Sequence, residues 1–291
     1  MPESKHIAVY TAVFGDYDVV LPPLVNEDRI DYICFTDNPS KIPSPWEVRE
    51  ISVDDLSPKL TSGKVKVLPH KYLPEYERSI WIDANIAISD QIAPLADEVL
   101  QGADLAVPQH PLRDCIYEEA EVCVDQKLIE PDITEQKMDK YREIGFPQNF
   151  GLSETRILIR DHQDPQVVET MRTWWKEYKE GPERDQLSFD YSLWECDPQY
   201  YRLPADTSTN SKHFEYSNHK KCMMFENTYE YLLRVKWKKR GSLPHVFYVA
   251  IYILYLLFEL FIRAINTIRN EGVDSLRKKI IRKINKTEFF Q

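Results

Sequence analysis

Apolar residues gather along most of the chain into short runs that are hydrophobic at successive positions. Each run ends at a Gly, a Pro or a polar turn residue, a pattern typical of β-strands. Strands that are apolar on both faces are covered on both sides, as in the mostly parallel sheet of an α/β domain. Strands are therefore predicted within His6–Gly15, Ile30–Pro39, Arg78–Ile88, Ala103–Pro111 and Thr155–His162.

Segments with apolar residues at helical spacing lie between and after these runs. Helices are predicted over Ile92–Leu100, Cys115–Val124, Ile133–Ile144, Pro165–Tyr178 and Gln186–Trp194. Together with the strands they form one α/β domain over residues 1–232, which we expect to be the catalytic domain. Residues 233–291 form a separate helical tail.

The tail contains one long apolar segment, Val246–Ile262, in which Glu259 is the only charged residue. Basic residues flank this segment, and a basic amphipathic stretch follows it. Its length is at the short limit for a bilayer-spanning helix, so we expect a helix that lies in the membrane interface with Lys and Arg on lipid phosphates. A true span, and a helix buried against the domain or in an oligomer, remain alternatives.

The charge distribution agrees with this division. Residues 221–291 hold 14 Lys and Arg against 6 Asp and Glu, a net charge of +8, whereas residues 1–220 hold 23 against 41, a net charge of −18. An acidic body disfavours nucleic-acid binding, and a basic tail suits an anionic surface. The start of the chain lacks the pattern of a signal peptide, and the five cysteines show no CxxC spacing. These features predict reduced thiols and a cytoplasmic location, peripheral on the inner face of the membrane.

Candidate chemistry lies at the ends of the predicted strands, because ligands of parallel α/β sheets bind beyond the carboxyl ends of the strands. The chain has neither GxGxxG nor GxxxxGK[ST], so a nucleotide diphosphate would need a divalent cation to offset its charge. Asp83 and Asn85 are two residues apart and place two oxygen ligands on one side of an extended segment, which suits Mg²⁺ or Mn²⁺. Alternatively, Asp83 caps a turn and Asn85 satisfies backbone groups.

Four separated motifs carry a resemblance to a known family: "KVKVLPHKYLPEYERSIWIDANI", "VPQHPLRDCIYEEA", "YREIGFPQNFGLSETRILIRDH" and "RDQLSFDYSLW". Residues 7 to 195 resemble the glycosyltransferase-like family of plant turgor-regulation and mucilage-polysaccharide proteins, which also occurs in bacterial surface-polysaccharide loci. The resemblance implies a GT-A type fold, a nucleotide-sugar donor and a variant of the DxD metal motif at Asp83 and Asn85. The Asn in this variant removes one negative charge and weakens metal binding.

By similarity to GT-A enzymes, the first strand end contributes nucleotide contacts from Thr11, Ala12 and Phe14. Asp37 would lie near the base and ribose, unless it only forms a turn ahead of Pro39. Further candidates offset the diphosphate charge or face the donor: Lys64, Arg184, Lys59, Lys66 and His70. Lys59 is equally suited to a solvated surface position, and His70 to capping a local helix.

On the acceptor side, GT-A enzymes often place an acid at the start of a helix. Asp185 is the first candidate to hold or deprotonate the acceptor hydroxyl, and Glu119 is the second. Each also has a purely structural interpretation, Asp185 as an N-cap and Glu119 as an acid favoured in a first helical turn. A late histidine completes the metal shell in several retaining GT-A families, which makes His213 and His219 candidates alongside their role as loop residues.

The sequence thus predicts a membrane-associated glycosyltransferase that moves a hexose from a nucleotide diphosphate sugar, with UDP the expected nucleotide, to a lipid-linked or polysaccharide acceptor. Two alternatives stay open: a lipid amide hydrolase, suggested by the membrane-facing tail, and a catalytically inactive scaffold that binds nucleotide sugars.

Overall fold

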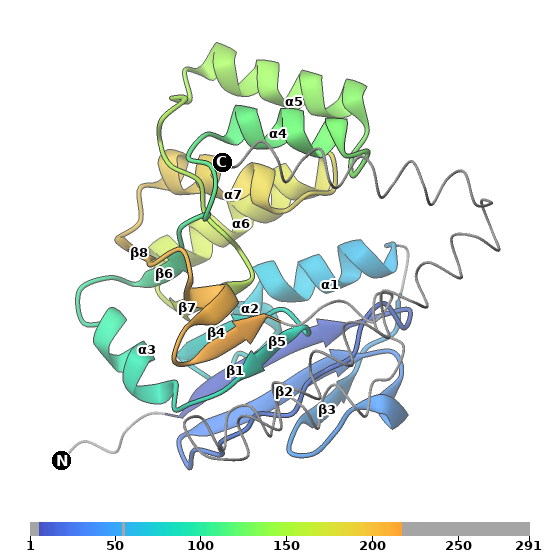
Figure 1. Cartoon of the computed structure of the whole chain (residues 1–291), viewed down its shortest axis with the longest axis vertical. Coiled ribbons are helices and arrows are strands. Elements are labelled where there is room, and N and C mark those ends of the chain that lie inside the picture. Colours follow the sequence, from blue (N-terminus) through green and yellow to red (C-terminus); the bar gives the residue numbers. More distant parts are fainter. Residues whose placement is uncertain (1–5, 54–55, 217–291) are drawn as a thin grey trace, which may run out of the picture. The chain divides into compact units, whose positions relative to one another are not determined.

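The structure is a computed structural model that describes residues 6–53 and 56–216 (Figure 1). The main sheet contains β1 (Ile7–Val13), β2 (Ile30–Thr36), β3 (Glu47–Glu50), β4 (Arg78–Ile82), β6 (Leu105–Pro108), β7 (Ile157–Asp161) and β8 (Tyr200–Leu203). A small second sheet pairs β5 (Ile86–Ile88) with β9 (Phe214–Tyr216). The helices are η1 (Pro39–Lys41), α1 (Pro58–Val67), α2 (Pro69–Tyr72), α3 (Ala93–Val99), α4 (Ile116–Asp125), α5 (Pro131–Ile144), α6 (Pro165–Lys179), α7 (Gln186–Cys196) and α8 (Thr207–Asn210).

The seven-stranded sheet has the order β3-β2-β1-β4-β7-β6-β8. Within this sheet the pairs that involve β7 are antiparallel, and the other pairs are parallel. This arrangement confirms the predicted α/β class with a mostly parallel sheet flanked by helices. Within this sheet β7 runs opposite to the other strands, a direction that its apolar sequence did not indicate.

Successive strand residues point to opposite faces of the sheet and build two separate cores. One core lies between the sheet, α3 and the β5–β9 pair, and the other lies between the sheet, α1, α6 and α7. A third apolar cluster joins α4, α5 and α7, and Figure 1 shows the α4–α5 pair on the side of α7 away from the sheet. The sheet is therefore buried on both faces, which explains its continuously apolar strands.

All ten segments predicted as strands or helices contain an element of the predicted type. The sequence did not predict α1, whose apolar positions are broken by a glycine, a serine, a threonine and three lysines, nor the short edge strands β3 and β8. The predicted domain boundary at residue 232 and the tail from residue 233 lie outside the described residues. Among the described helices, none has the length and apolar character needed to cross a membrane.

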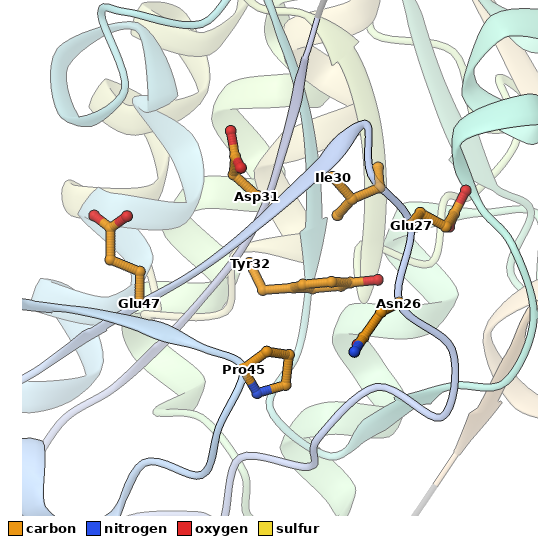
Figure 2. A pocket seen from close by; sticks show the side chains of 7 residues that line it. All are labelled: Asn26, Glu27, Ile30, Asp31, Tyr32, Pro45 and Glu47. Carbon is orange, nitrogen blue, oxygen red and sulfur yellow. The ribbon is translucent and has the colours of Figure 1, made fainter.

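A shallow pocket lies at the amino ends of β2 and β3, the edge opposite to the one where β1, β2 and β4 end (Figure 2). Its lining includes Glu27, Asp31 and Glu47 around the Tyr32 ring. The three carboxylates lie apart from one another in Figure 2, and Glu27 accepts hydrogen bonds from the backbone amides at the start of α3. They therefore do not converge on one ligand.

Candidate active site

The six strands that run in the same direction end at one edge of the sheet, and β7 begins at that same edge because it runs the opposite way. The amide of Asp83, directly after β4, donates a hydrogen bond to the carbonyl of Arg156, directly before β7, at 3.0 Å. This edge consequently combines residues that follow β4 with residues that precede β7.

The Lys66 ammonium lies at the centre of this edge. Its Nζ is 2.6 Å from Asp185 Oδ2 and 3.6 Å from Asp83 Oδ1, and its side chain is only 8% exposed. The Thr155 hydroxyl is 3.3 Å from the same Nζ, and the Trp81 ring centroid is 5.5 Å away. Lys66 therefore links a carboxylate on the β4 side to a carboxylate at the start of α7.

Asp185 immediately precedes α7 but does not cap it, since its side chain accepts no bond from the helix amides. Its Oδ2 instead accepts hydrogen bonds from Lys66 and from the Thr155 hydroxyl at 3.1 Å. Burial pushes the pKa of the Asp185 carboxyl up, but the charge and hydrogen bond of Lys66 outweigh burial and hold the pKa below its ordinary value. The group is thus a stable carboxylate at neutral pH.

Only one of the two carboxylate oxygens of Asp83 accepts a hydrogen bond from the described residues. Its Oδ1 accepts a hydrogen bond from the Trp81 indole at 2.8 Å, while its Oδ2 accepts none from the described residues. The side chain is 33% exposed, so this second oxygen can take an external ligand.

Glu119 is the most enclosed of the predicted acids, with a side chain 3% exposed. Arg113 donates to it through Nε at 2.6 Å and Nη2 at 2.5 Å, and the Arg184 guanidinium lies 3.8 Å from its other oxygen. His110 Nε2 lies 3.9 Å from Glu119 Oε2, while His110 Nδ1 accepts from the Arg113 amide. In this arrangement Glu119 orients two arginines.

A fourth carboxylate, Glu154, was not among the residues predicted for the site. It is 7% exposed and pairs with Arg156 Nε at 3.4 Å. Burial raises the pKa of Glu154. The Arg156 guanidinium lowers this pKa and the Asp83 charge raises it, and the net shift is upward. Glu154 was not predicted because ligand-binding residues were expected after strands, and Glu154 precedes its strand. The antiparallel direction of β7 brings the start of that strand to this edge.

The residues predicted to contact the nucleotide lie around the ends of β1 and β2. Thr11 is fully buried within β1, and Ala12 and Phe14 are also buried. Asp37 is exposed and accepts hydrogen bonds from the Gly15 amide at 3.0 and 3.2 Å, so it ties the two strand ends together. Lys64 is half-buried, one turn before the end of α1.

The predicted metal ligands are only partly brought together. Asn85 is 2% exposed and lies in the turn after Asp83. His213 lies opposite Ser89 at the far end of β5, and its Nδ1 contacts the Gln91 carbonyl at 2.6 Å. Three strand residues separate it from Asn85, roughly 10 Å at the rise of a strand. His219 lies outside the described residues.

No group of three or more His, Cys, Asp and Glu side chains in the described part of the chain could enclose a metal ion. Asp83 nevertheless fits a partial site, because it offers one open carboxylate oxygen at the accessible edge. Mg²⁺ and Mn²⁺ sites with few protein ligands take their remaining ligands from water and substrate phosphates. The donor set thus suits a cation that is shared with a diphosphate.

A model of the TOD1/MUCI70 glycosyltransferase-like domain matches residues 45–228, more than half of the chain. The chain belongs to this family. The family predicted from the four sequence motifs is thereby confirmed. Alkaline ceramidase TOD1 of Arabidopsis thaliana is 24% identical over 197 residues, covering 55% of this chain and 42% of the relative. The match thus spans less than half of that relative's length.

Two similar solved structures are glycosyltransferases. Mouse xyloside xylosyltransferase 1 in its apo form has a TM-score of 0.39 and 14% identity, over 68% of this chain and 84% of that one. The apo structure of the bifunctional glycosyltransferase WbbM has a TM-score of 0.46 and 11% identity, over 81% of this chain and 45% of that one. At these values the overlaps assign no residue a role.

Proposed function

We propose that this chain is a glycosyltransferase that moves a hexose from a nucleotide diphosphate sugar, with UDP as the nucleotide, to a lipid-linked or polysaccharide acceptor. The observation that carries the proposal is the Lys66 ammonium between Asp83 and Asp185, at the edge where the strands of like direction end in a glycosyltransferase-like domain. A nucleotide-sugar donor needs a cationic environment for its diphosphate, and an acceptor hydroxyl needs a hydrogen-bond acceptor beside the sugar.

In the transfer, the bond between the sugar C1 and the diphosphate oxygen breaks, and a bond from C1 to the acceptor oxygen forms. Negative charge grows on the leaving UDP, where the fixed cations Lys66 and Arg184 stabilise it without reorganising. The acceptor hydroxyl must also lose its proton, which passes to the Asp185 carboxylate or directly to the departing diphosphate oxygen. Asp185 stays ionised beside Lys66 and so can accept a hydrogen bond from that hydroxyl and orient it.

A divalent cation, Mn²⁺ or Mg²⁺, fits this scheme as the proposed cofactor. Asp83 and Asn85 would hold it, and it would supply Lewis-acid stabilisation of the departing diphosphate. Because Asp83 keeps one oxygen open while Trp81 fixes the other, the chain orients this ligand before any substrate arrives.

Hydrolysis of a lipid amide is a second candidate, because the similar Arabidopsis protein is named an alkaline ceramidase. That reaction requires an activated water molecule in place of an acceptor hydroxyl. Glu154, with its burial-raised pKa, is the described carboxyl suited to take a proton from such a water. Lys66 and Arg184 bring two cations to this carboxylate-lined edge, and together with a divalent cation they suit a diphosphate better than a neutral amide, so we rank transfer first.

The proposed location is the cytoplasmic face of a membrane, where the basic tail would hold the domain near lipid-linked acceptors. An inactive scaffold that binds nucleotide sugars is the remaining alternative. It would bind UDP without turning over any donor.

One assay separates these functions. The protein is incubated with a panel of UDP-hexoses and Mn²⁺, with and without polyprenyl-linked acceptors, and in parallel with ceramide. Release of UDP that is lost in Asp185→Asn and kept in Asp139→Asn, a carboxylate on the exposed side of α5, supports the proposal. Release of fatty acid from ceramide without UDP release from any donor would overturn it.

A further inference from the structure

Arg160 is a fully buried guanidinium on β7 that plays no part in the site described above. Its Nη2 contacts the Tyr10 hydroxyl and donates to the Lys66 carbonyl at 3.0 Å, and its Nη1 lies 3.1 Å from Met171 Sδ. Among the described residues, no carboxylate forms an ion pair with it. A buried cation without a counter-charge is costly, so another negative partner must stabilise it.

The carboxyl end of α1 supplies that partner. The last carbonyls of a helix have no amide partner inside it and carry part of the negative end of the helix dipole. The carbonyl of Lys66, in the last turn of α1, receives Arg160 and the Tyr10 hydroxyl, the latter at 2.7 Å. Burial raises the pKa of Tyr10 to about 12, so its hydroxyl stays protonated and donates this bond.

The neighbouring histidines add no second positive charge beside Arg160. Burial, reinforced by nearby cations that include Arg160, lowers the pKa of His70 to about 4. Burial also lowers the pKa of His162 to about 4, and its ring contacts the Leu73 carbonyl. Both rings are therefore neutral at physiological pH, so neither adds to the positive charge of Arg160 that the end of α1 must offset.

Lys66 is thus held at two places. Arg160 and Tyr10 bind its backbone carbonyl in the core, and Asp185 binds its ammonium at the site. We propose that Arg160 and Tyr10 are positioning residues, which fix the last turn of α1 so that the Lys66 ammonium meets Asp185 and Asp83. This inference rests on the proposed function insofar as Lys66 faces the donor diphosphate.

The first test needs no substrate. Wild type, Arg160→Met and Tyr10→Phe are treated with a limiting amine-reactive reagent, and mass spectrometry measures the labelling rate of Lys66. Lys66 is 8% exposed and paired, so it reacts slowly in the wild type, and we expect at least about a tenfold faster rate in Arg160→Met and a smaller rise in Tyr10→Phe. Glu177→Gln is the matched control, because it breaks a buried pair with Lys137 that does not touch Lys66.

Unchanged Lys66 labelling in both folded variants would overturn the inference, as would an equal rise in Glu177→Gln. Tyr10→Phe keeps the ring and loses only the hydroxyl, so it preserves a test if Arg160→Met does not fold.

The second test uses transfer rates in a double-mutant cycle of Arg160→Met and Lys66→Met. Misplacing a site group by about 1 Å can cost roughly a hundredfold in rate, so Arg160→Met should lower transfer by about tenfold to a hundredfold. In the Lys66→Met background it should lower transfer by less than about threefold. Equal losses in both backgrounds would contradict action through Lys66. If the wild type transfers no sugar at all, the proposed function fails while the labelling test still decides the positioning role.

Discussion

Replacing Lys66 with Met removes the ammonium while keeping the length of the side chain. At the observed 2.6 Å between Nζ and Asp185 Oδ2, two unit charges attract by roughly 6 kcal/mol at an effective dielectric constant of about 20. The desolvation of both groups offsets part of this attraction, and removing one partner of a buried pair typically costs about 3–5 kcal/mol. Because the Asp185 side chain is still 21% exposed, we expect the lower end, about 3 kcal/mol.

For a domain of this size that loss lowers the melting temperature by about 6–12 °C. Urea and thermal unfolding at pH 7 measure both quantities. Lys64→Met is the matched control, since Lys64 lies on the same helix and forms no ion pair with the described residues; it should change stability by less than about 0.5 kcal/mol. The double variant Lys66→Met/Asp185→Leu should recover much of the loss, because it leaves no unpaired buried charge. Equal stability of the Lys66 and Lys64 variants would show that the Lys66–Asp185 ion pair does not stabilise the domain.

Three further predictions follow from the packing and charges. Gly63→Ala should destabilise the domain by about 1–3 kcal/mol, because its Cβ would lie 2.3 Å from Tyr178 Cε1; Gly102→Ala, with nothing within 4 Å, should be nearly neutral in the same unfolding assay. Because the folded pKa of Asp185 lies below its unfolded value of about 3.9, its contribution to stability is present above that pH and is lost as pH falls through the folded pKa. Unfolding free energy measured from pH 6 to pH 2 should therefore fall less steeply in Asp185→Asn. His213→Ala should change the affinity for Mn²⁺ by less than about twofold, because the His213 ring contacts a backbone carbonyl away from the site. Electron paramagnetic resonance of free Mn²⁺ measures this affinity. Loss of Mn²⁺ binding in the variant would instead identify His213 as a metal ligand.

The sequence predicted the sheet from its continuous apolar runs and five helices from the apolar segments between and after those runs. It did not predict α1, where a glycine and several polar residues break the apolar positions. It also could not rank the three lysines of that helix. The structure shows which lysine faces inward: Lys66 is buried at the site, whereas Lys59 is exposed.

Strand direction is a second feature that could not be predicted from the sequence. Apolar runs have the same pattern in either direction, so β7 could not be recognised as antiparallel. Its reversed direction brings Glu154 and Thr155 to the site. The position of Asp185 before a helix also allowed a role as N-cap. In the structure its carboxylate instead accepts a hydrogen bond from the Lys66 ammonium.

The proposed function requires this edge to bind a nucleotide diphosphate together with a divalent cation. Calorimetric titration with UDP and UDP-hexoses, with and without Mn²⁺, measures this binding in the wild type and in Asp83→Ala. We expect Mn²⁺ to strengthen binding at least about tenfold in the wild type and to have no such effect in the variant. Absence of binding to every UDP ligand in the wild type, with or without Mn²⁺, would contradict the proposed function.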